Sequence, residues 1–265
     1  MATSIGFIGT GHMGSAIIKG LAGKDFDIHG IDLNRARVEQ LAAEYSLLPA
    51  TSVRGLVAVC DYVVLAVKPQ HAAAVLAEAA PELNKGRCLI SIAAGIPLAR
   101  LKEWSEARCP VVRVMPNTPA LVGAGVFALC LDDPLLSGKQ KKLVHKLFGL
   151  LGETHALPEH LFDAYTAVVG CGPAYVFYFM EALVEVAVNL GFGRDLATHM
   201  VKGLFTGSAR LAVEGGHHLS LLREMVTSPA GSTVRALHHM DKKGVRGQIM
   251  EAVIKAYKRN RELGE

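Results

Sequence analysis

Three glycines near the start of the chain have the spacing of a dinucleotide-binding turn. Gly9, Gly11 and Gly14 form the pattern G-x-G-x-x-G directly after an apolar run and at the start of a helical pattern. The first glycine allows a tight turn, the second lets a pyrophosphate approach the backbone, and the third lets the helix pack closely on the strand. The N-terminus of that helix attracts phosphate charge. The pattern therefore predicts a dinucleotide site.

Residues at the end of the next strand bear on which dinucleotide binds. Asp32 closes the run DIHGID, eighteen residues after Gly14, where a carboxylate can hydrogen-bond the adenine-ribose 2′-hydroxyl of NAD. Asn34, Arg35 and Arg37 follow, and they could hold the 2′-phosphate of NADP. Asn34 could equally cap a helix, with the arginines solvated. The residues alone leave both cofactors open.

Three further loops follow strands of the same region. The segments Ala66–Pro69 (AVKP) and Ile92–Gly95 (IAAG) are small enough to let a nicotinamide ring lie near the backbone. Asn117 and Thr118 form a polar loop that two flanking prolines restrict. Open α/β sheets bind ligands at the carboxyl ends of their strands, so three such loops at one edge favour a binding site.

Strand and helix patterns alternate up to about residue 157. Helical stretches such as RARVEQLAAEY and HAAAVLAEAA lie between the β-rich runs, which predicts a parallel or mixed sheet with helices on both faces. We therefore predict an α/β Rossmann-type domain over residues 1–157. Its strands should be IGFIG, DIHGID, YVVLAV, CLISIA, VVRVM, VFALCL and THAL.

The β-rich runs stop at residue 158. Long patterns of period 3.6, among them AYVFYFMEALVEVAVNLG and RGQIMEAVIKAYKRNREL, predict an all-α domain over residues 158–265. The segment AYVFYFMEALVEVAV is apolar nearly all round, so we expect it inside a helical cluster or at a subunit interface. No low-complexity linker separates the two domains, and we expect them to adjoin directly.

The composition argues against several classes of protein. Hydrophobic residues make up 51% of the 265 residues, which allows a substantial core. The net charge of +4 is spread out, without the basic patch of a nucleic-acid surface. Neither a signal peptide nor a run of eighteen uncharged apolar residues occurs, so we expect a soluble, cytoplasmic protein that does not enter membranes. Five scattered cysteines indicate reduced thiols, and no metal site is expected.

A small polar cluster, VTSPAGSTVRAL at residues 226–237, stands within apolar helical sequence. Ser228 followed by Pro229 is a common helix start, with Ser as N-cap and Pro at the first helical position. On this interpretation Ala230 needs only helical backbone angles. The first turn of such a helix offers free backbone N–H groups with the positive end of the helix dipole behind them, which suits an anionic ligand.

Six motifs follow one another along the whole chain: IGFIGTGHMG, LAVKPQ, ISIAAGI, RVMPNTPALVGAG, VVGCGPAYVF and VTSPAGSTVRAL. In their order and spacing they resemble the pyrroline-5-carboxylate reductase family, the enzymes that complete proline synthesis. The last three motifs are specific, because other dinucleotide enzymes with similar N-terminal domains lack them. The resemblance implies a Rossmann domain joined to a helical domain that interlocks with its twin in a homodimer, often built further into larger rings.

The resemblance also implies an activity and a set of contacts. Hydride would pass from NADPH or NADH to the C=N carbon of 1-pyrroline-5-carboxylate, giving L-proline, with the substrate at the dimer interface. Substrate contacts would fall on Ala230, Gly231, Ser232 and Thr233. Cofactor contacts would fall on Ile8, Gly9, Thr10, Gly11, His12, Met13, Gly14, Asn34, Arg35, Ala66, Val67, Lys68, Pro69, Ile92, Ala93, Ala94 and Asn117.

This chemistry asks little of the protein. A cyclic imine protonates to an iminium, which is a strong electrophile, so the enzyme must mainly align the nicotinamide C4 with the imine carbon. The free N–H groups of the polar cluster would receive the substrate carboxylate. Thr233 supplies a hydroxyl that can contact the imine nitrogen, either to position the substrate or to pass a proton. We therefore expect Thr233 to be the catalytic residue.

Some residues depart from the family pattern, and two other functions share the N-terminal architecture. Val53 stands where many relatives carry Asn, Ala230 replaces the first glycine of S-P-G-G, and Cys171 replaces a serine. A β-hydroxyacid dehydrogenase would need a lysine in the start of its second domain, and GCGPAYVFYFMEAL has none. A dinucleotide-binding regulator without turnover would not need the retained Ser232 and Thr233. These features favour the reductase.

Overall fold

The computed structural model describes residues 2–264, which form two compact units. The first unit holds the chain through Cys171 together with the residues from Tyr257 onward, and the second holds Gly172–Ala256. The compact first unit extends to Cys171, beyond the predicted functional boundary between residues 157 and 158. It does so because Phe162 and Tyr165 pack into a buried cluster with strand residues of the first unit. The functional boundary itself stays a prediction.

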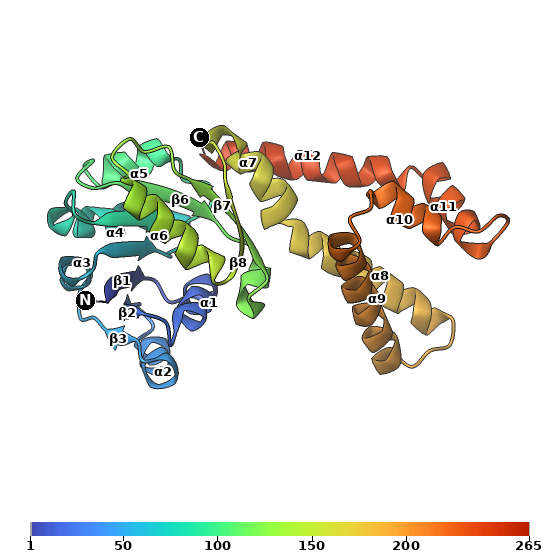
Figure 1. The fold of residues 1–265 in the computed structure, drawn as a ribbon, viewed down its shortest axis with the longest axis horizontal. Helices are drawn as coiled ribbons and strands as arrows, with labels where there is room; N and C mark the ends of the chain where they lie inside the picture. Colours follow the sequence, from blue (N-terminus) through green and yellow to red (C-terminus); the bar gives the residue numbers. More distant parts are fainter. Residues whose placement is uncertain (1, 265) are drawn as a thin grey trace. The chain divides into compact units, whose positions relative to one another are not determined.

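An eight-stranded sheet forms the centre of the first unit (Figure 1). Its order is β3-β2-β1-β4-β5-β6-β7-β8. The strands from β3 to β6 are parallel, whereas β7 runs antiparallel to β6 and β8 is parallel to β7. The order 3-2-1-4-5-6 is that of Rossmann sheets, which confirms the predicted fold class. The strands are β1 (Thr3–Ile8), β2 (Phe26–Ile31), β3 (Leu48–Pro49), β4 (Tyr62–Leu65), β5 (Cys88–Ser91), β6 (Val111–Met115), β7 (Gly125–Cys130) and β8 (Gly152–Ala156).

Helices cover both faces of this sheet, as predicted. Side chains alternate between the faces of a strand, so Ile5 and Phe7 of β1 enter one buried cluster while Ile8 enters another. The first cluster packs against α1 (His12–Leu21), α2 (Arg35–Tyr45) and α6 (Gly138–Gly149). The second packs against α3 (Val53–Val59), α4 (Pro69–Ala79) and α5 (Leu98–Trp104), and it includes Leu83, which follows the 3-10 helix η1 (Ala80–Glu82).

Several short helical turns connect or follow the last three strands of the sheet. The 3-10 helix η2 (Thr118–Val122) joins β6 to β7, and η3 (Glu159–Leu161), α7 (Phe162–Tyr165) and η4 (Thr166–Gly170) follow β8. The last of these is a π-helical turn, in which the Cys171 N–H donates to the Thr166 carbonyl at 2.8 Å. Single π-turns are rare and concentrate near functional sites.

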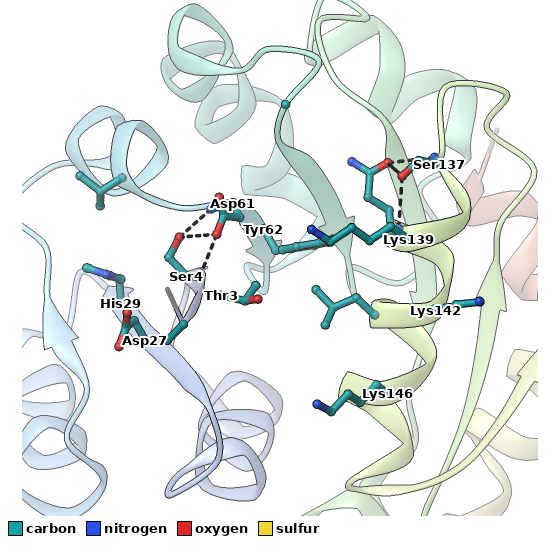
Figure 2. A pocket seen from close by; sticks show the side chains of 15 residues that line it. Thr3, Ser4, Asp27, His29, Asp61, Tyr62, Ser137, Lys139, Lys142 and Lys146 are labelled. Carbon is teal, nitrogen blue, oxygen red and sulfur yellow. Dashed lines mark hydrogen bonds between the residues drawn. The ribbon is translucent and has the colours of Figure 1, made fainter.

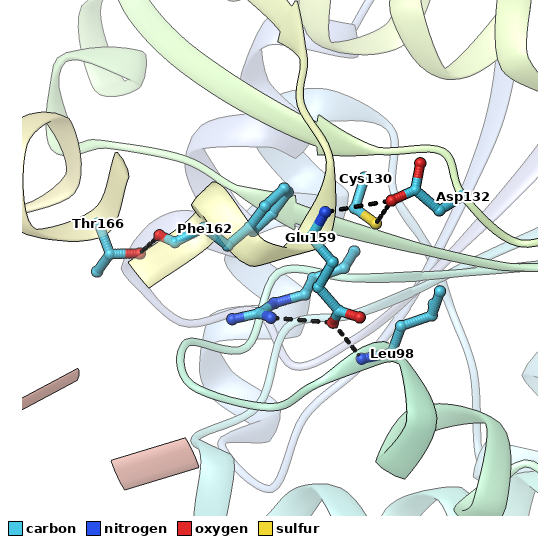
Figure 3. Close-up of polar contacts among 7 residues, drawn as sticks. Leu98, Cys130, Asp132, Glu159, Phe162 and Thr166 are labelled. Atoms are coloured by element: carbon cyan, nitrogen blue, oxygen red, sulfur yellow. Dashed lines mark hydrogen bonds and ion pairs between the residues drawn. The ribbon is translucent and has the colours of Figure 1, made fainter. Parts of the chain in front are cut away.

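A buried arginine anchors this segment to β6. Arg113 forms an ion pair with Glu159 at 3.1 Å between Nη1 and Oε1, and its guanidinium lies 4.8 Å from the ring centre of Phe162. The same Glu159 oxygen accepts the N–H of Leu98 at 2.6 Å (Figure 3). Because Arg113 is almost fully buried, its charge needs this partner. The anchor fixes η3 and α7 on the sheet.

The second unit is helical, as predicted. Its elements are α8 (Gly172–Asn189), α9 (Arg194–Glu214), α10 (Leu219–Met225), α11 (Ser232–Lys242) and most of α12 (Val245–Gly264). Of its residues only Ala197 and Val201 are buried, whereas large apolar side chains such as Tyr178 and Leu190 are more than 70% exposed. Exposed apolar surfaces of this size mark sites that contact another protein or a membrane.

The apolar helices also bear on the expectation of no membrane segment. The helical run Glu159–Asn189 is long and apolar enough to cross a membrane by length and composition alone, with a mean hydropathy of 1.5. Only 6% of that apolar stretch is buried in the single chain. A helix that lies in a subunit interface meets the same criteria, so the absence of a membrane contact stays a prediction.

The helix at the polar cluster begins later than predicted. Ser232 is the first residue of α11 and Gly231 is its N-cap, so Ser228 does not cap this helix. Instead, Ser228 to Gly231 form a β-turn closed by the Gly231 N–H and the Ser228 carbonyl at 3.1 Å. The prediction of helical angles at Ala230 was wrong, because its φ is +58°. Proline at the second position and positive φ at the third are the features of a type II turn.

Candidate active site

The predicted cofactor loops meet at the carboxyl edge of the parallel strands. The Ala66 N–H donates to the Ile8 carbonyl at 2.8 Å, and the Ile92 N–H donates to the Leu65 carbonyl at 3.1 Å. These bonds tie together the ends of β1, β4 and β5. The edge between β1 and β4 is the topological switch point, where doubly wound sheets bind their ligands.

Each glycine of the motif has a distinct steric role. Gly9 has φ of +100°, and a Cβ there would lie 2.6 Å from the Ala66 carbonyl oxygen. A Cβ on Gly14 would lie 2.5 Å from the Gly9 oxygen, so the helix could not pack as closely. A Cβ on Gly11 would meet nothing within 4 Å. Gly9 and Gly14 therefore shape the loop, while the space beside Gly11 is open for a ligand.

The N-terminus of α1 presents free donors to that space. Its N-cap is Gly11, which has no side chain to cap it. The first donation back along the helix comes from Ser15, whose N–H bonds the Gly11 carbonyl at 2.8 Å. The N–H groups of His12 and Met13 come before it and have no helical acceptor. Free donors, the helix dipole and open space fit a dinucleotide pyrophosphate.

Asp32 closes the turn from the other side. Its Oδ2 accepts the Thr10 N–H at 2.6 Å and the Thr10 hydroxyl at 3.1 Å, and its Oδ1 accepts the Asn34 N–H at 2.9 Å. Partial burial raises the pKa of Asp32, but these donors and Arg37 outweigh it and hold the pKa below its ordinary value. The carboxylate is ionised and bound within its own chain.

The residues beyond Asp32 face solvent. Leu33, Asn34 and Arg35 are exposed, and Arg37 is half-buried. The Asn34 side chain caps α2 by accepting the Arg37 N–H at 3.2 Å, which confirms the capping interpretation. The side chain of Arg35, the first residue of α2, makes none of the described hydrogen bonds or ion pairs. It is free to meet a phosphate group.

The strand-end loops combine buried and exposed positions. After β4, Ala66 and Val67 are half-buried, whereas Lys68 and Pro69 are exposed at the start of α4. After β5, Ile92 and Ala93 are buried and Ala94 is exposed. The small residues leave backbone groups accessible at this edge. Their contact with a nicotinamide ring stays a prediction.

Asn117 is buried and its carboxamide bonds to the protein backbone. Its Oδ1 accepts the Val126 N–H at 2.9 Å, and its Nδ2 donates to the Val169 carbonyl at 3.4 Å. The residue therefore links the end of β6 to β7 and to the π-turn. Only 7% of Asn117 is exposed, so the geometry gives it a structural duty beside the predicted cofactor contact.

The predicted substrate residues lie in the second unit. Ala230 and Ser232 are exposed, while Gly231 and Thr233 are half-buried. Since Gly231 is the N-cap and no side chain caps α11, the free N–H groups belong to Ser232 and Thr233. The predicted bare helix start is thus present, but it is shifted along the chain. Substrate contact by these residues stays a prediction.

A separate groove of about 1060 Å³ lies at the amino edge of the sheet (Figure 2). Lys139, Lys142 and Lys146 line it from one face of α6, opposite Asp27 and Asp61. None of the predicted site residues lines this groove. Its charges are mixed, and Lys residues at this spacing are typical of a solvated helix face.

Comparisons with known proteins cover the whole chain. Residues 159–263 match the model of the pyrroline-5-carboxylate reductase dimerisation family, and residues 4–95 match that of coenzyme F420-dependent NADP oxidoreductases. Pyrroline-5-carboxylate reductase of Pisum sativum is 36% identical, with coverage of 98% of this chain and 96% of that protein. The enzyme of Methanosarcina acetivorans is 35% identical, with 98% of each chain covered. The solved structure of Plasmodium falciparum pyrroline carboxylate reductase with NADP bound has a TM-score of 0.87 and 31% identity, with coverage of 99% of this chain and 98% of that one.

The fold and the site together define a class. A Rossmann sheet with an open glycine loop, followed by a helical dimerisation region, is the architecture of an NAD(P)-dependent oxidoreductase. The full-length relatives are more specific, and the chain belongs to the pyrroline-5-carboxylate reductase family. The predicted family and enzyme class are confirmed.

Proposed function

We propose that this chain reduces 1-pyrroline-5-carboxylate to L-proline with hydride from NADPH. The observation that carries the proposal is its identity of 35–36% to reductases of this name over nearly the whole chain. The glycine loop adds a physical argument, because the open space at Gly11 and the free N–H groups of α1 suit a pyrophosphate. When bound, the dinucleotide supplies the hydride from its nicotinamide C4.

On this proposal the first unit holds the cofactor. The N–H groups of His12 and Met13 bind the pyrophosphate, and Arg35 binds the adenosine 2′-phosphate as a charge-assisted donor. The loops that begin at Ala66 and Ile92 contact the nicotinamide half of the dinucleotide. Their small residues let a planar ring lie against the backbone.

The second unit is proposed to bind the substrate. The free N–H groups at Ser232 and Thr233 receive the substrate carboxylate, helped by the α11 dipole. The Thr233 hydroxyl contacts the imine nitrogen and keeps the ring in place for attack at the carbon. Positioning of the protonated imine then accounts for most of the rate, because an iminium accepts hydride without further activation.

The dimerisation family match and the exposed apolar helices support a homodimer. Burial against a second copy gives residues such as Tyr178 and Leu190 the cover that a single chain lacks. A larger ring built from dimers and a cytoplasmic location are further parts of the proposal. Both rest on the resemblance to relatives of this family.

The experiment that tests the proposal compares Thr233→Ala with Ser220→Ala, a polar residue of the neighbouring helix α10 that serves as control. With NADPH and pyrroline-5-carboxylate, Thr233→Ala should lower kcat/KM for the imine at least about tenfold, the loss of one hydrogen bond to a charged group. NADPH affinity should stay within about twofold of the wild-type value, since the hydroxyl faces the imine. Unchanged kinetics in Thr233→Ala would remove Thr233 from the site, and a folded protein that binds NADPH but makes no proline would contradict the proposed function.

A further inference from the structure

Asp32 stands where a ribose-binding acid is expected, yet both of its oxygens bond within the chain. Oδ2 takes two hydrogen bonds from Thr10, at 2.6 Å from the N–H and 3.1 Å from the hydroxyl. Oδ1 takes the Asn34 N–H at 2.9 Å. One carboxylate therefore joins the glycine loop after β1 to the loop that follows β2.

Thr10, the residue that donates to Asp32 Oδ2, is buried away from water. Thr10 has 0% of its surface exposed, so its backbone N–H and its hydroxyl have no solvent to replace the Asp32 oxygen. A buried donor that loses its acceptor costs about 1–3 kcal/mol. Thr10 stands between Gly9 and Gly11, and the Asp32 carboxylate therefore holds the loop that must approach the pyrophosphate.

The surface available to the adenosine ribose is made by other residues. Leu33 is 102% exposed, and Asn34 and Arg35 lie beside it at the N-terminus of α2. A 2′-phosphate is favoured there by the Arg35 charge and by the α2 dipole. A 2′-hydroxyl gains little from either, because it is neutral.

We propose that Asp32 is a positioning residue for the pyrophosphate loop and does not select between NADPH and NADH, a choice that the proposed function gives to Arg35. This inference rests on the proposed function, whose cofactor choice it explains. A loop-holding carboxylate serves both dinucleotides equally, since they share the pyrophosphate. A ribose-binding carboxylate serves NADH and repels the 2′-phosphate of NADPH.

The test measures the dissociation constants of NADPH and NADH by cofactor fluorescence, without substrate, for wild type and Asp32→Asn. An amide in place of the carboxylate must turn a donor toward Thr10 or Asn34, so both cofactors should bind about tenfold or more weakly, with the ratio of their constants unchanged. Asp27→Asn is the matched control, because Asp27 is an exposed acid at the other end of β2, the strand that leads into Asp32. Arg35→Gln should weaken NADPH alone, by about tenfold.

Two outcomes would overturn the inference. The first is a selective loss of NADH binding in Asp32→Asn with NADPH unchanged or tighter, and the second is no loss for either cofactor. If Asp32→Asn does not fold, Thr10→Val removes only the hydroxyl bond and should weaken both cofactors by the same factor of about two to five. An unequal change in that variant, or none, would also contradict it. Failure of the wild type to bind either dinucleotide would instead contradict the proposed function.

Discussion

Asn117 donates from Nδ2 to the carbonyl of Val169, 3.4 Å away, and so joins the carboxyl end of β6 to the π-turn η4. On its other side Asn117 accepts the Val126 N–H at 2.9 Å. The glycine at position 170 permits this close approach, because a Cβ there would lie 3.0 Å from the Met115 methyl carbon. The end of β6, β7 and the π-turn are held together by one buried side chain.

Asn117→Ala should therefore lower the free energy of unfolding more than it weakens cofactor binding. The change leaves the Val126 N–H and the Val169 carbonyl without their side-chain partner, at a cost of about 2 kcal/mol. Urea unfolding should show this loss, while the NADPH dissociation constant stays within about threefold of wild type. Thr118→Ala, at the exposed neighbouring position, should change neither. A large loss of NADPH affinity with unchanged stability would show that the Asn117 carboxamide serves the cofactor and not the backbone.

Two glycine variants should separate folding from binding. Gly11→Ala meets no neighbour within 4 Å and should fold with wild-type stability, but its methyl group should block the pyrophosphate and lower NADPH affinity at least about a hundredfold. Gly9→Ala places a Cβ 2.6 Å from the Ala66 oxygen at φ +100°, so it should lose both stability and binding. Thermal unfolding and cofactor titration check the pair. Wild-type NADPH affinity in Gly11→Ala would rule out the assignment of the loop to the pyrophosphate.

Ala230→Gly should stabilise the protein. The φ of +58° at Ala230 is unfavourable for a residue with a Cβ, by about 1 kcal/mol, whereas glycine adopts it freely. The gain in the free energy of unfolding should be a few tenths to about 1 kcal/mol, because glycine also loosens the unfolded chain. Ser208→Gly, inside α9, should destabilise instead. A lower melting temperature in Ala230→Gly would argue against the left-handed turn.

Buried thiols should make the protein sensitive to alkali. Burial raises the pKa of Cys60 to about 12 and the pKa values of Cys109 and Cys130 to about 11, from an ordinary 9.0. Unfolded thiols therefore release their protons first as pH rises, and the free energy of unfolding falls from about pH 9 upward. Each thiol contributes about 1.4 kcal/mol per pH unit until its folded-state pKa is reached.

Urea unfolding at about pH 8 and about pH 10 measures this loss. Because Cys109 is buried, Cys109→Ala should reduce the difference between the two conditions by the contribution of one thiol. Equal urea midpoints at both pH values would mean that the thiols of the folded protein titrate as they do in the unfolded chain.

Local patterns were enough to predict the glycine loop and seven of the eight strands, whereas the two-residue strand β3 was too short to leave a pattern. The strand runs, the helices between them and the spacing of Gly9, Gly11 and Gly14 are all short-range signals, and each appears at its predicted place. The start of α11 was less predictable, because Ser228 and Pro229 suit a helix cap and a type II turn equally well. Gly231 after Ala230 was the only hint of the turn.

Long-range partners could not be read from the sequence. The side-chain direction of Asp32 depends on its hydrogen bonds with Thr10, which lies in another loop. The sequence alone therefore cannot distinguish a ribose-binding Asp32 from one that holds the glycine loop. The ion pair of Arg113 with Glu159 and the π-turn that follows have no pattern of their own. The arginine inside the apolar strand VVRVM was a signal that a buried partner must exist, though not which one.

Transfer of deuterium tests the central claim most directly. NADPH that carries deuterium at the transferred position of nicotinamide C4 is incubated with pyrroline-5-carboxylate and the purified protein, and the product is analysed by mass spectrometry. The proposed function predicts L-proline with one deuterium on the ring carbon that formed the C=N bond, in step with NADPH oxidation. Proline without deuterium, or no proline from a protein that binds both NADPH and the imine, would contradict it.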